Sequence, residues 1–143
     1  MAENNKVIRL HYEVDGEDFS LAGEASSNVK KVLKQLGFDP QVVRKVAIAM
    51  YEGEINMVIH AQGGTVEVEI TPAQIKMILQ DQGPGIPDID LAMQEGYSTA
   101  PHKIRELGFG AGMGLPNMKS YTDEMHIRSE VGKGTTVEMI VKT

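Results

Sequence analysis

The sequence predicts an α+β fold, a two-layer α/β sandwich in which helices cover one face of a largely antiparallel mixed sheet. Two observations support this fold class. Segments of alternating apolar and polar residues occur in pairs joined by short turns, which is typical of β-hairpins. Two segments with helical spacing precede those hairpins, so the expected order is strand, helix, helix, strand, strand, long loop, helix, strand, strand.

The first part of the chain is expected to form an edge strand and two helices. VIRLHYEV (7–14) alternates in polarity and predicts a strand with one buried face. Apolar residues follow a helical period over 19–36, and Gly37 suits the end of that helix. An Asp-Pro pair, which is favourable as N-cap and first helical residue, starts a second helix over 39–61 that the glycines at 63–64 end.

The second part is expected to hold two hairpins separated by a glycine-rich segment. TVEVEI (65–70) and QIKMILQD (74–81) form the first hairpin. LPNMKSYTD (115–123) can form a short helix. EMHIRSE (124–130) and TTVEMIVK (135–142) flank the turn VGKG and form the second hairpin.

Length and composition fit one globular domain spanning residues 1–143, with 41% apolar residues. The chain has no cysteine, so it has neither a disulfide framework nor a thiolate metal site. The N-terminus lacks the order of a signal peptide and no apolar run approaches a membrane span, so we expect a cytoplasmic protein without a membrane partner. A net charge of −6 with dispersed Lys and Arg argues against a nucleic-acid partner.

A polar stripe on the second helix is the first candidate for chemistry. Glu52, Asn56 and His60 are spaced four residues apart, so Glu52 and Asn56 project side by side. Asn supplies a neutral oxygen ligand for Mg²⁺ and Glu can accept a proton, although an ordinary polar helix face has the same pattern. Gly53, in the middle of the helix, suggests that another backbone or a ligand comes close, and Glu54 is expected to be solvated.

The segment DQGPGIPD (81–88) is the second candidate. Asp81 ends a strand, and its carboxylate can accept a hydrogen bond from an exocyclic amine such as that of adenine. Gly83 and Gly85 let a flat ligand approach the main chain. The alternative is a Pro-Gly turn in which Asp81 is only a local cap.

Two further glycine motifs follow. GFGAGMGLPNM (108–118) exposes backbone N–H groups before a helix, which suits phosphates. Its GxGxGxG spacing is neither the dinucleotide fingerprint nor a P-loop, and a mobile surface segment is the alternative. We expect the segment from Gly83 to Gly114 to be a mobile lid over the phosphates. GKGTT (132–136) suits a hairpin turn whose threonines could add a hydroxyl to a site.

Taken together and in this order, the four motifs resemble those of the GHKL ATPase superfamily, whose ATP-binding (Bergerat) fold is shared by gyrase, Hsp90, histidine kinases and MutL. E-x-x-x-N at 52–56 looks like the N box, DQGPG like the G1 box, GAGMGL like the G2 box and GKGTT like the last glycine box. The resemblance covers nearly the whole chain. Within the superfamily, the chain is most similar to the small bacterial anti-sigma factors and stress-response switch kinases.

The resemblance implies a role for each matching residue. Asn56 would ligate Mg²⁺ at the triphosphate, and Glu52 would be the general base or would orient the attacking hydroxyl. Asp81 would hold the adenine amine, with Gly85 packed near the base and Thr135 in support. The other implied nucleotide and lid residues are Gly83 beside the ligand, Ser98 and Thr99 in the lid, Arg105 as the candidate for the γ-phosphate, and Gly110, Gly112 and Gly114 around the phosphates.

The resemblance also implies a function, that of an ATP- and Mg²⁺-dependent serine/threonine protein kinase that phosphorylates a STAS-domain partner in transcriptional or stress regulation. One alternative is a nucleotide-gated binding module that sequesters a sigma factor or another regulator with little kinase activity. The catalytic domain of a sensor histidine kinase is less favoured, because the residues before Val7 leave no room for a phosphoacceptor hairpin. A homodimer is compatible with either of the first two functions.

Overall fold

The computed structural model describes residues 7–15, 23–61, 63–83, 85, 93 and 114–143. The helices and strands of this part of the chain follow the expected order. They are β1 (Ile8–Asp15), α1 (Glu24–Gln35), α2 (Pro40–Ala61), β2 (Gly63–Ile70), β3 (Gln74–Gln80), α5 (Gly114–Ser120), β4 (Glu124–Glu130) and β5 (Gly134–Lys142).

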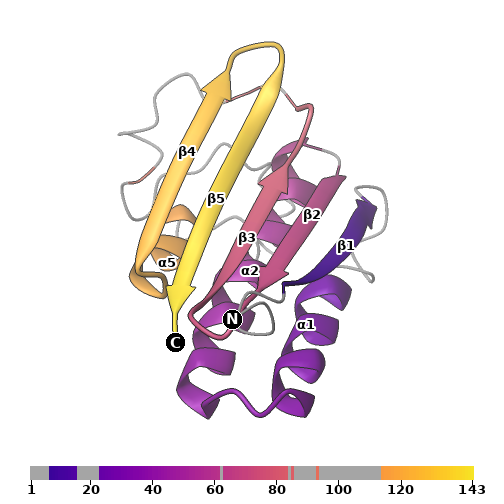
Figure 1. Ribbon diagram of the computed structural model, residues 1–143. Coiled ribbons are helices and arrows are strands. Elements are labelled where there is room, and N and C mark those ends of the chain that lie inside the picture. Colours follow the sequence, from indigo (N-terminus) through magenta and orange to yellow (C-terminus); the bar gives the residue numbers. More distant parts are fainter. Residues whose placement is uncertain (1–6, 16–22, 62, 84, 86–92, 94–113) are drawn as a thin grey trace, which may run out of the picture.

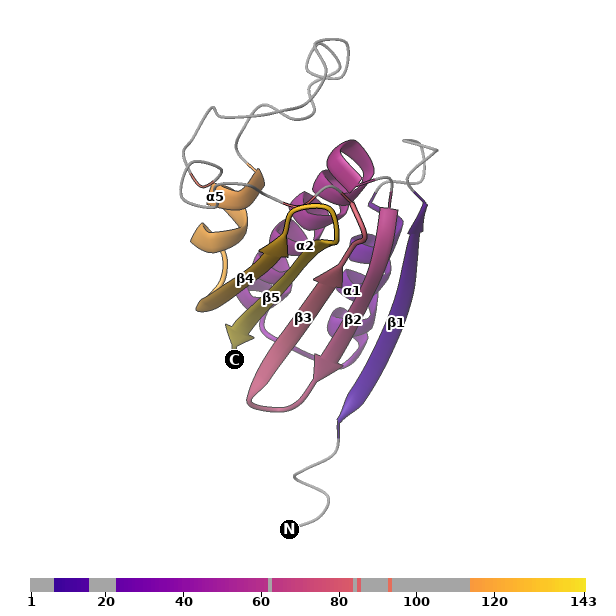
Figure 2. The ribbon, with the colours of Figure 1, turned by 90° about the horizontal axis from the view of Figure 1, so that it is seen from above.

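The strands form one sheet in the order β1-β2-β3-β5-β4, and all pairings between these described strands are antiparallel. The two expected hairpins, β2–β3 and β4–β5, are present, and β1 lies at an edge of the sheet. Figure 1 looks onto the sheet from the side opposite the described helices, which lie behind it. Figure 2 shows from above that these helices share one side of the sheet, so the predicted two-layer α+β fold is confirmed.

The core lies between the sheet and the helices because one face of each central strand is apolar. Val68 of β2, Met77 of β3 and Met139 of β5 are fully buried on that face. Helix α2 occupies the middle of the helical layer, with α1 on one side and α5 on the other. Its residues Val46 and Met50 are also fully buried. Residues 52–58 of α2 are all buried or half-buried, whereas Arg44 and Lys45 nearer its start are exposed.

The ends of the first two helices match their sequence signals. Gly37 has a φ of 82°, and its N–H donates to the carbonyl of Lys34 at 3.1 Å, which closes the last turn of α1. Asp39 Oδ1 accepts from the backbone N–H of Gln41 at 2.8 Å, which caps the first turn of α2. Both signals are local, so the sequence alone was sufficient to place them.

Some boundaries differ from the predicted ones. Helix α1 begins at Glu24, and the predicted start at residue 19 lies outside the described residues. Strand β2 begins at Gly63, so the two glycines predicted to end α2 belong to the strand instead. Helix α5 ends at Ser120, before the predicted end. Among the helices of the described ranges, none is long and apolar enough to span a membrane.

Candidate functional site

Asp81 follows the last residue of β3, at the end of the sheet where β5 begins. Its Oδ1 accepts hydrogen bonds from the backbone N–H groups of Gly83 at 2.9 Å and Thr135 at 3.2 Å. Its own N–H donates to the Thr135 carbonyl at 2.9 Å. The bond to Gly83 is the local cap that a plain turn would have, whereas the bonds to Thr135 tie this loop to β5. Both side-chain bonds end on Oδ1, so Oδ2 is the oxygen that could accept from the amine of a ligand.

Two glycines let neighbouring strands come very close to Asp81. A Cβ atom on Gly134 of β5 would lie 2.2 Å from the Asp81 carbonyl oxygen, and one on Gly64 of β2 would lie 3.1 Å from the Asp81 Cα. Gly134 also has a φ of 129°, which favours glycine. Neither glycine is among the predicted site residues. Both glycines lie at the start of a strand that pairs with β3, and Asp81 directly follows β3. A glycine in that position indicates a close approach of the two backbones.

Gly85 has a φ of 81° and is crowded by backbone atoms of a neighbouring turn. A Cβ atom there would lie 2.5 Å from the Glu130 carbonyl oxygen and 2.9 Å from the Val131 Cα. The turn between β4 and β5 therefore lies directly against Gly85. A side chain at position 85 would collide with the backbone of this turn, so the fold itself requires a glycine here, whether or not a flat ligand binds.

Helix α2 lies on the inner face of the sheet with Gly53 above Leu79 of β3. A Cβ atom on Gly53 would lie 2.2 Å from Leu79 Cδ2 and 3.4 Å from the sulfur of Met118 of α5. The close approach expected at Gly53 is present, and apolar side chains of β3 and α5 make it. One turn further along, Met57 Cε lies 2.5 Å from the Cβ position of Gly64. The later part of α2 thus lies against the strand end that holds the aspartate.

Glu52 and Asn56 lie on this part of α2, and both are half-buried. Their spacing puts them on the same side of the helix. Glu52 Oε1 accepts a hydrogen bond from Asn117 Nδ2 of α5 at 3.4 Å. Asn117 is not among the predicted site residues, because helical spacing cannot say which residue of α5 meets α2.

Thr135, which is 9% exposed, connects the aspartate to the second hairpin. Its Oγ1 lies 2.8 Å from the Oγ of Ser129 on β4, and Ser129 Oγ donates to the Gly134 carbonyl at 3.3 Å. Strands β4 and β5 therefore share hydrogen bonds next to the loop that follows β3. Asp81 and Thr135, which the resemblance pairs, are brought together here.

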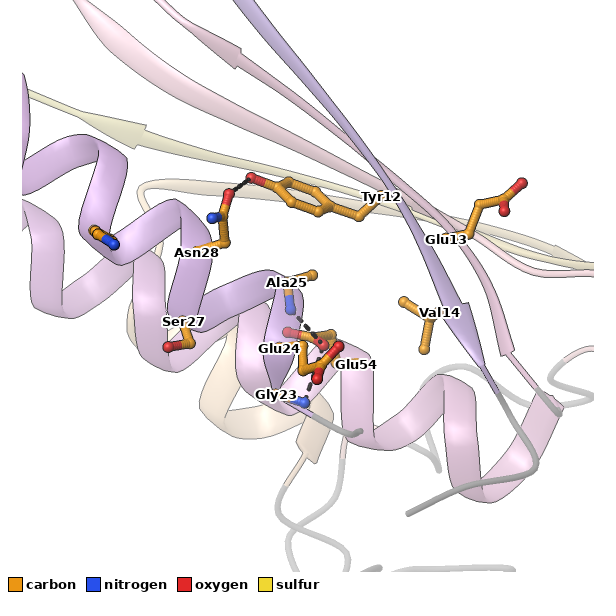
Figure 3. Close-up of a pocket in the computed structure, with 10 residues that line it drawn as sticks. Tyr12, Glu13, Val14, Gly23, Glu24, Ala25, Ser27, Asn28 and Glu54 are labelled. Carbon is orange, nitrogen blue, oxygen red and sulfur yellow. Dashed lines mark hydrogen bonds between the residues drawn. The ribbon is translucent and has the colours of Figure 1, made fainter. Parts of the chain in front are cut away.

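Glu54 differs most from expectation. It was predicted to be solvated, but it is 1% exposed. Its carboxylate lies at the start of α1, where it accepts from the backbone N–H groups of Gly23 (3.0 Å), Ala25 (3.3 Å) and Ser26 (2.6 Å). Figure 3 shows the bonds to Gly23 and Ala25. The N-cap residue of α1 is Gly23, which has no side chain that could accept a hydrogen bond from the first turn. Glu54 thus supplies from α2 the acceptors that the first turn of α1 lacks, and its negative charge suits a helix N-terminus.

A groove of about 660 Å³ opens beside this contact, between β1 and α1. On its wall, the Tyr12 hydroxyl donates to Asn28 Oδ1. Burial raises the pKa of Tyr12 above its ordinary value, and the negative charge of Glu54 raises it further. The folded protein therefore keeps Tyr12 neutral to a higher pH than the unfolded chain does.

Glu54→Gln is expected to lower the pKa of Tyr12, because it removes the smaller of the two causes and leaves burial in place. The value should stay above about 10, the ordinary tyrosine pKa. Since the folded pKa is the higher one, the stability contributed by Tyr12 is present below about pH 10 and is lost as the pH rises through the folded value. NMR titration of ¹³C-labelled tyrosine measures this, with the exposed Glu13→Gln as control. An unchanged Tyr12 pKa would show that the charge of Glu54 does not reach the ring.

The side chains at this end of the sheet fit an adenine nucleotide with a divalent cation. Asp81 offers a carboxylate oxygen to an amine, Asn56 offers an oxygen ligand of the kind that Mg²⁺ accepts, and Glu52 offers a carboxylate that can take a proton. Within the described ranges, no three His, Cys, Asp or Glu side chains group as a metal site. Mg²⁺ in nucleotide sites takes phosphate oxygens and waters as further ligands, so one or two protein ligands suffice.

Part of the predicted site lies outside the described residues. This holds for most of the predicted lid and for five site residues, and the side chain of His60, which has no assigned role, also lies outside them. The five site residues are Ser98, Thr99, Arg105, Gly110 and Gly112. Gly114 is described and begins α5, as expected from the sequence.

Comparisons with known proteins identify the family of this chain. Residues 17–141 match the family described as Histidine kinase-like ATPase domain. The serine/threonine-protein kinase RsbT of Bacillus subtilis is 34% identical over 115 residues, which cover 78% of this chain and 80% of that protein. The anti-sigma F factor of Geobacillus stearothermophilus is 30% identical over 136 residues, which cover 91% of this chain and 88% of that protein.

A solved structure shares the fold. The crystal structure of the RsbU and RsbW domains of a Mycobacterium tuberculosis protein matches 94% of this chain with a TM-score of 0.63. This chain spans only 32% of that longer chain. At 16% sequence identity, the likeness concerns the fold alone.

Proposed function

The chain belongs to the histidine kinase-like ATPase family, in its group of anti-sigma factors and switch kinases, and from this premise we propose that it is a protein serine/threonine kinase. The proposed reaction transfers the γ-phosphoryl group of ATP, with Mg²⁺, to a serine or threonine of a STAS-domain partner in transcriptional or stress regulation. Such a transfer acts as a switch, because it adds a charge of about −1.5 to −2 to the partner. We propose that residues 1–143 act as a single domain.

The observation that supports the proposal most is the position of α2 over the strand end that holds Asp81. Met57 packs at Gly64, Gly64 borders Asp81, and Asn56 precedes Met57 in the chain. Asp81, which suits the adenine base, and Asn56, which suits a metal ion, thus lie on adjoining elements at one end of the sheet. Phosphoryl transfer depends mainly on positioning and charge neutralisation, for which such an arrangement is adequate.

Each side chain has a proposed role. Asp81 accepts the adenine amine at Oδ2 while Oδ1 stays with the backbone amides. Asn56 would offer its carboxamide oxygen to Mg²⁺, which would neutralise charge on the phosphates, while ATP would supply the phosphoryl group and leave as ADP. Glu52 orients the partner's hydroxyl and takes its proton during attack. The remaining residues proposed at the nucleotide are Gly83, Gly85, Ser98, Thr99, Arg105, Gly110, Gly112, Gly114 and Thr135.

Single-turnover transfer from γ-labelled ATP to STAS-domain proteins encoded near this chain tests the kinase proposal. We expect the label on a serine or threonine of one partner, and we expect it to require Mg²⁺. If the wild-type protein binds Mg·ATP but labels none of these partners, the kinase proposal is contradicted.

Asp81→Asn is expected to weaken ATP binding while the fold stays intact. Asn keeps an oxygen for the backbone bonds now made by Oδ1, but its amide turns the second acceptor into a donor that faces the adenine amine. A mismatched buried polar group costs about 1–3 kcal/mol, so the affinity should fall roughly 5- to 150-fold. Calorimetric titration with Mg·ATP and Mg·GTP measures this, and the preference for adenine over guanine should shrink.

Asp81→Ala is the matched control for that variant. It also removes the acceptor of the Gly83 and Thr135 N–H groups, so it should lower the Tm as well as the affinity. If Asp81→Asn binds ATP as tightly as the wild type does, Asp81 does not contact the adenine.

Sequestration of a sigma factor is a second candidate function, favoured by the relatives that are named anti-sigma F factor. Nucleotide-gated binding would use Asp81 and Asn56 but would not need Glu52 as a base. If sequestration is the only function, the wild-type protein binds a sigma factor with nucleotide present and transfers no label. Glu52→Gln should then leave that binding unchanged.

A further inference from the structure

We propose that Asn117 is a positioning residue for Glu52, which holds one carboxylate oxygen so that the other faces the hydroxyl to be phosphorylated. The inference rests on the proposed function, in which Glu52 takes the proton of that hydroxyl. Asn117 Nδ2 donates to Glu52 Oε1 at 3.4 Å. Because this contact engages Oε1, Oε2 is the oxygen with which Glu52 can meet the partner's hydroxyl.

The packing of α5 gives the Asn117 side chain a defined position. Leu115 and Met118, on either side of it in the sequence, are 8% and 1% exposed, so the helix is anchored around Asn117. The Met118 sulfur lies 3.4 Å from the Cβ position of Gly53, the residue after Glu52. This is an ordinary van der Waals contact, so α5 packs directly on α2 beside Glu52, where the two polar side chains meet.

The chemistry of the amide suits this task. A Lys or Arg at position 117 would pair with Glu52 and hold its charge in a salt bridge. The neutral amide of Asn117 instead fixes the direction of the carboxylate and leaves it able to accept a proton. Asn117 also belongs to the helix that begins at Gly114, the last glycine of the predicted phosphate loop. The position of α5 is thereby coupled to Glu52 through one hydrogen bond.

A double-mutant cycle with Glu52→Gln tests the proposal. Asn117→Leu has a similarly branched side chain but no donor, and it is expected to slow single-turnover transfer about tenfold while Mg·ATP affinity stays within about twofold of the wild type. In the Glu52→Gln background the same substitution should have little further effect, because Asn117 acts through Glu52. Asn117→Gln keeps the donor and should restore part of the rate, and the exposed Ser120→Ala on the same helix should match the wild type.

A second readout is independent of kinase activity. In the free protein, the side-chain amide NMR signals of Asn117 should shift in Glu52→Gln and stay in place in the exposed control Glu13→Gln. Equal losses of rate from Asn117→Leu in both backgrounds, or an unshifted amide, would overturn the role of Asn117 alone. Absence of transfer by the wild-type protein would instead contradict the proposed function, and with it this role, even if the amide shifts.

Discussion

Glu52→Gln is expected to lower the rate of phosphoryl transfer by roughly 10²-fold or more while ATP affinity stays near the wild-type value. Gln keeps the shape of the side chain and an oxygen that can accept from Asn117, so the contact between α2 and α5 should survive. It cannot take a proton from the attacking hydroxyl, so the loss should appear only in the transfer step. Single-turnover transfer to a STAS-domain partner, run beside calorimetric titrations of Mg·ATP, separates the two effects.

Asn56→Ala is the matched comparison on the same helix face. If Asn56 is a metal ligand, this variant should lose Mg²⁺-dependent nucleotide affinity and transfer together. Transfer at the wild-type rate by Glu52→Gln would exclude Glu52 as the base. An equal loss of affinity in both variants would show that Glu52 acts in binding instead.

The elements of the fold could be predicted from the sequence because their signals are local. The alternation in 74–81 and 135–142 reflects the two-residue period of a strand, and Gly37 and Asp39 mark helix ends by their own backbone preferences. The place of β5 between β3 and β4 could not be predicted in this way. It depends on pairing such as Gln74 with Lys142, which are far apart in the chain.

The residues of the candidate site could be predicted only where they belong to a recognisable sequence motif. Asp81 and Thr135 belong to separate motifs, and the structure joins them through backbone hydrogen bonds. Gly64 and Asn117 escaped prediction because their importance depends on what packs against them. An asparagine in a short helix carries no sequence mark of such a neighbour, and a glycine at the start of a strand becomes informative only once the pairing of the strands is known.

Glu54 escaped prediction for a related reason. Helical geometry places it away from Glu52, and that side of α2 was taken to face solvent. The packing of α1 against α2 buries that side instead. A helix that starts after Gly23, without a capping side chain, has N–H groups that need an acceptor from elsewhere in the fold.

Glu54→Ala is therefore expected to lower the free energy of unfolding by about 3–5 kcal/mol, because it leaves the N–H groups of Gly23, Ala25 and Ser26 without their acceptor in a buried place. Glu54→Gln keeps the volume and one acceptor oxygen, so its loss should be about half as large. The exposed Glu13→Gln, beside the same groove, should change stability by less than about 0.5 kcal/mol. Denaturant unfolding measures all three, and amide exchange at Ala25 and Ser26 should accelerate only in the Glu54 variants. Wild-type stability in Glu54→Ala would mean that water or another group can replace the carboxylate at the start of α1.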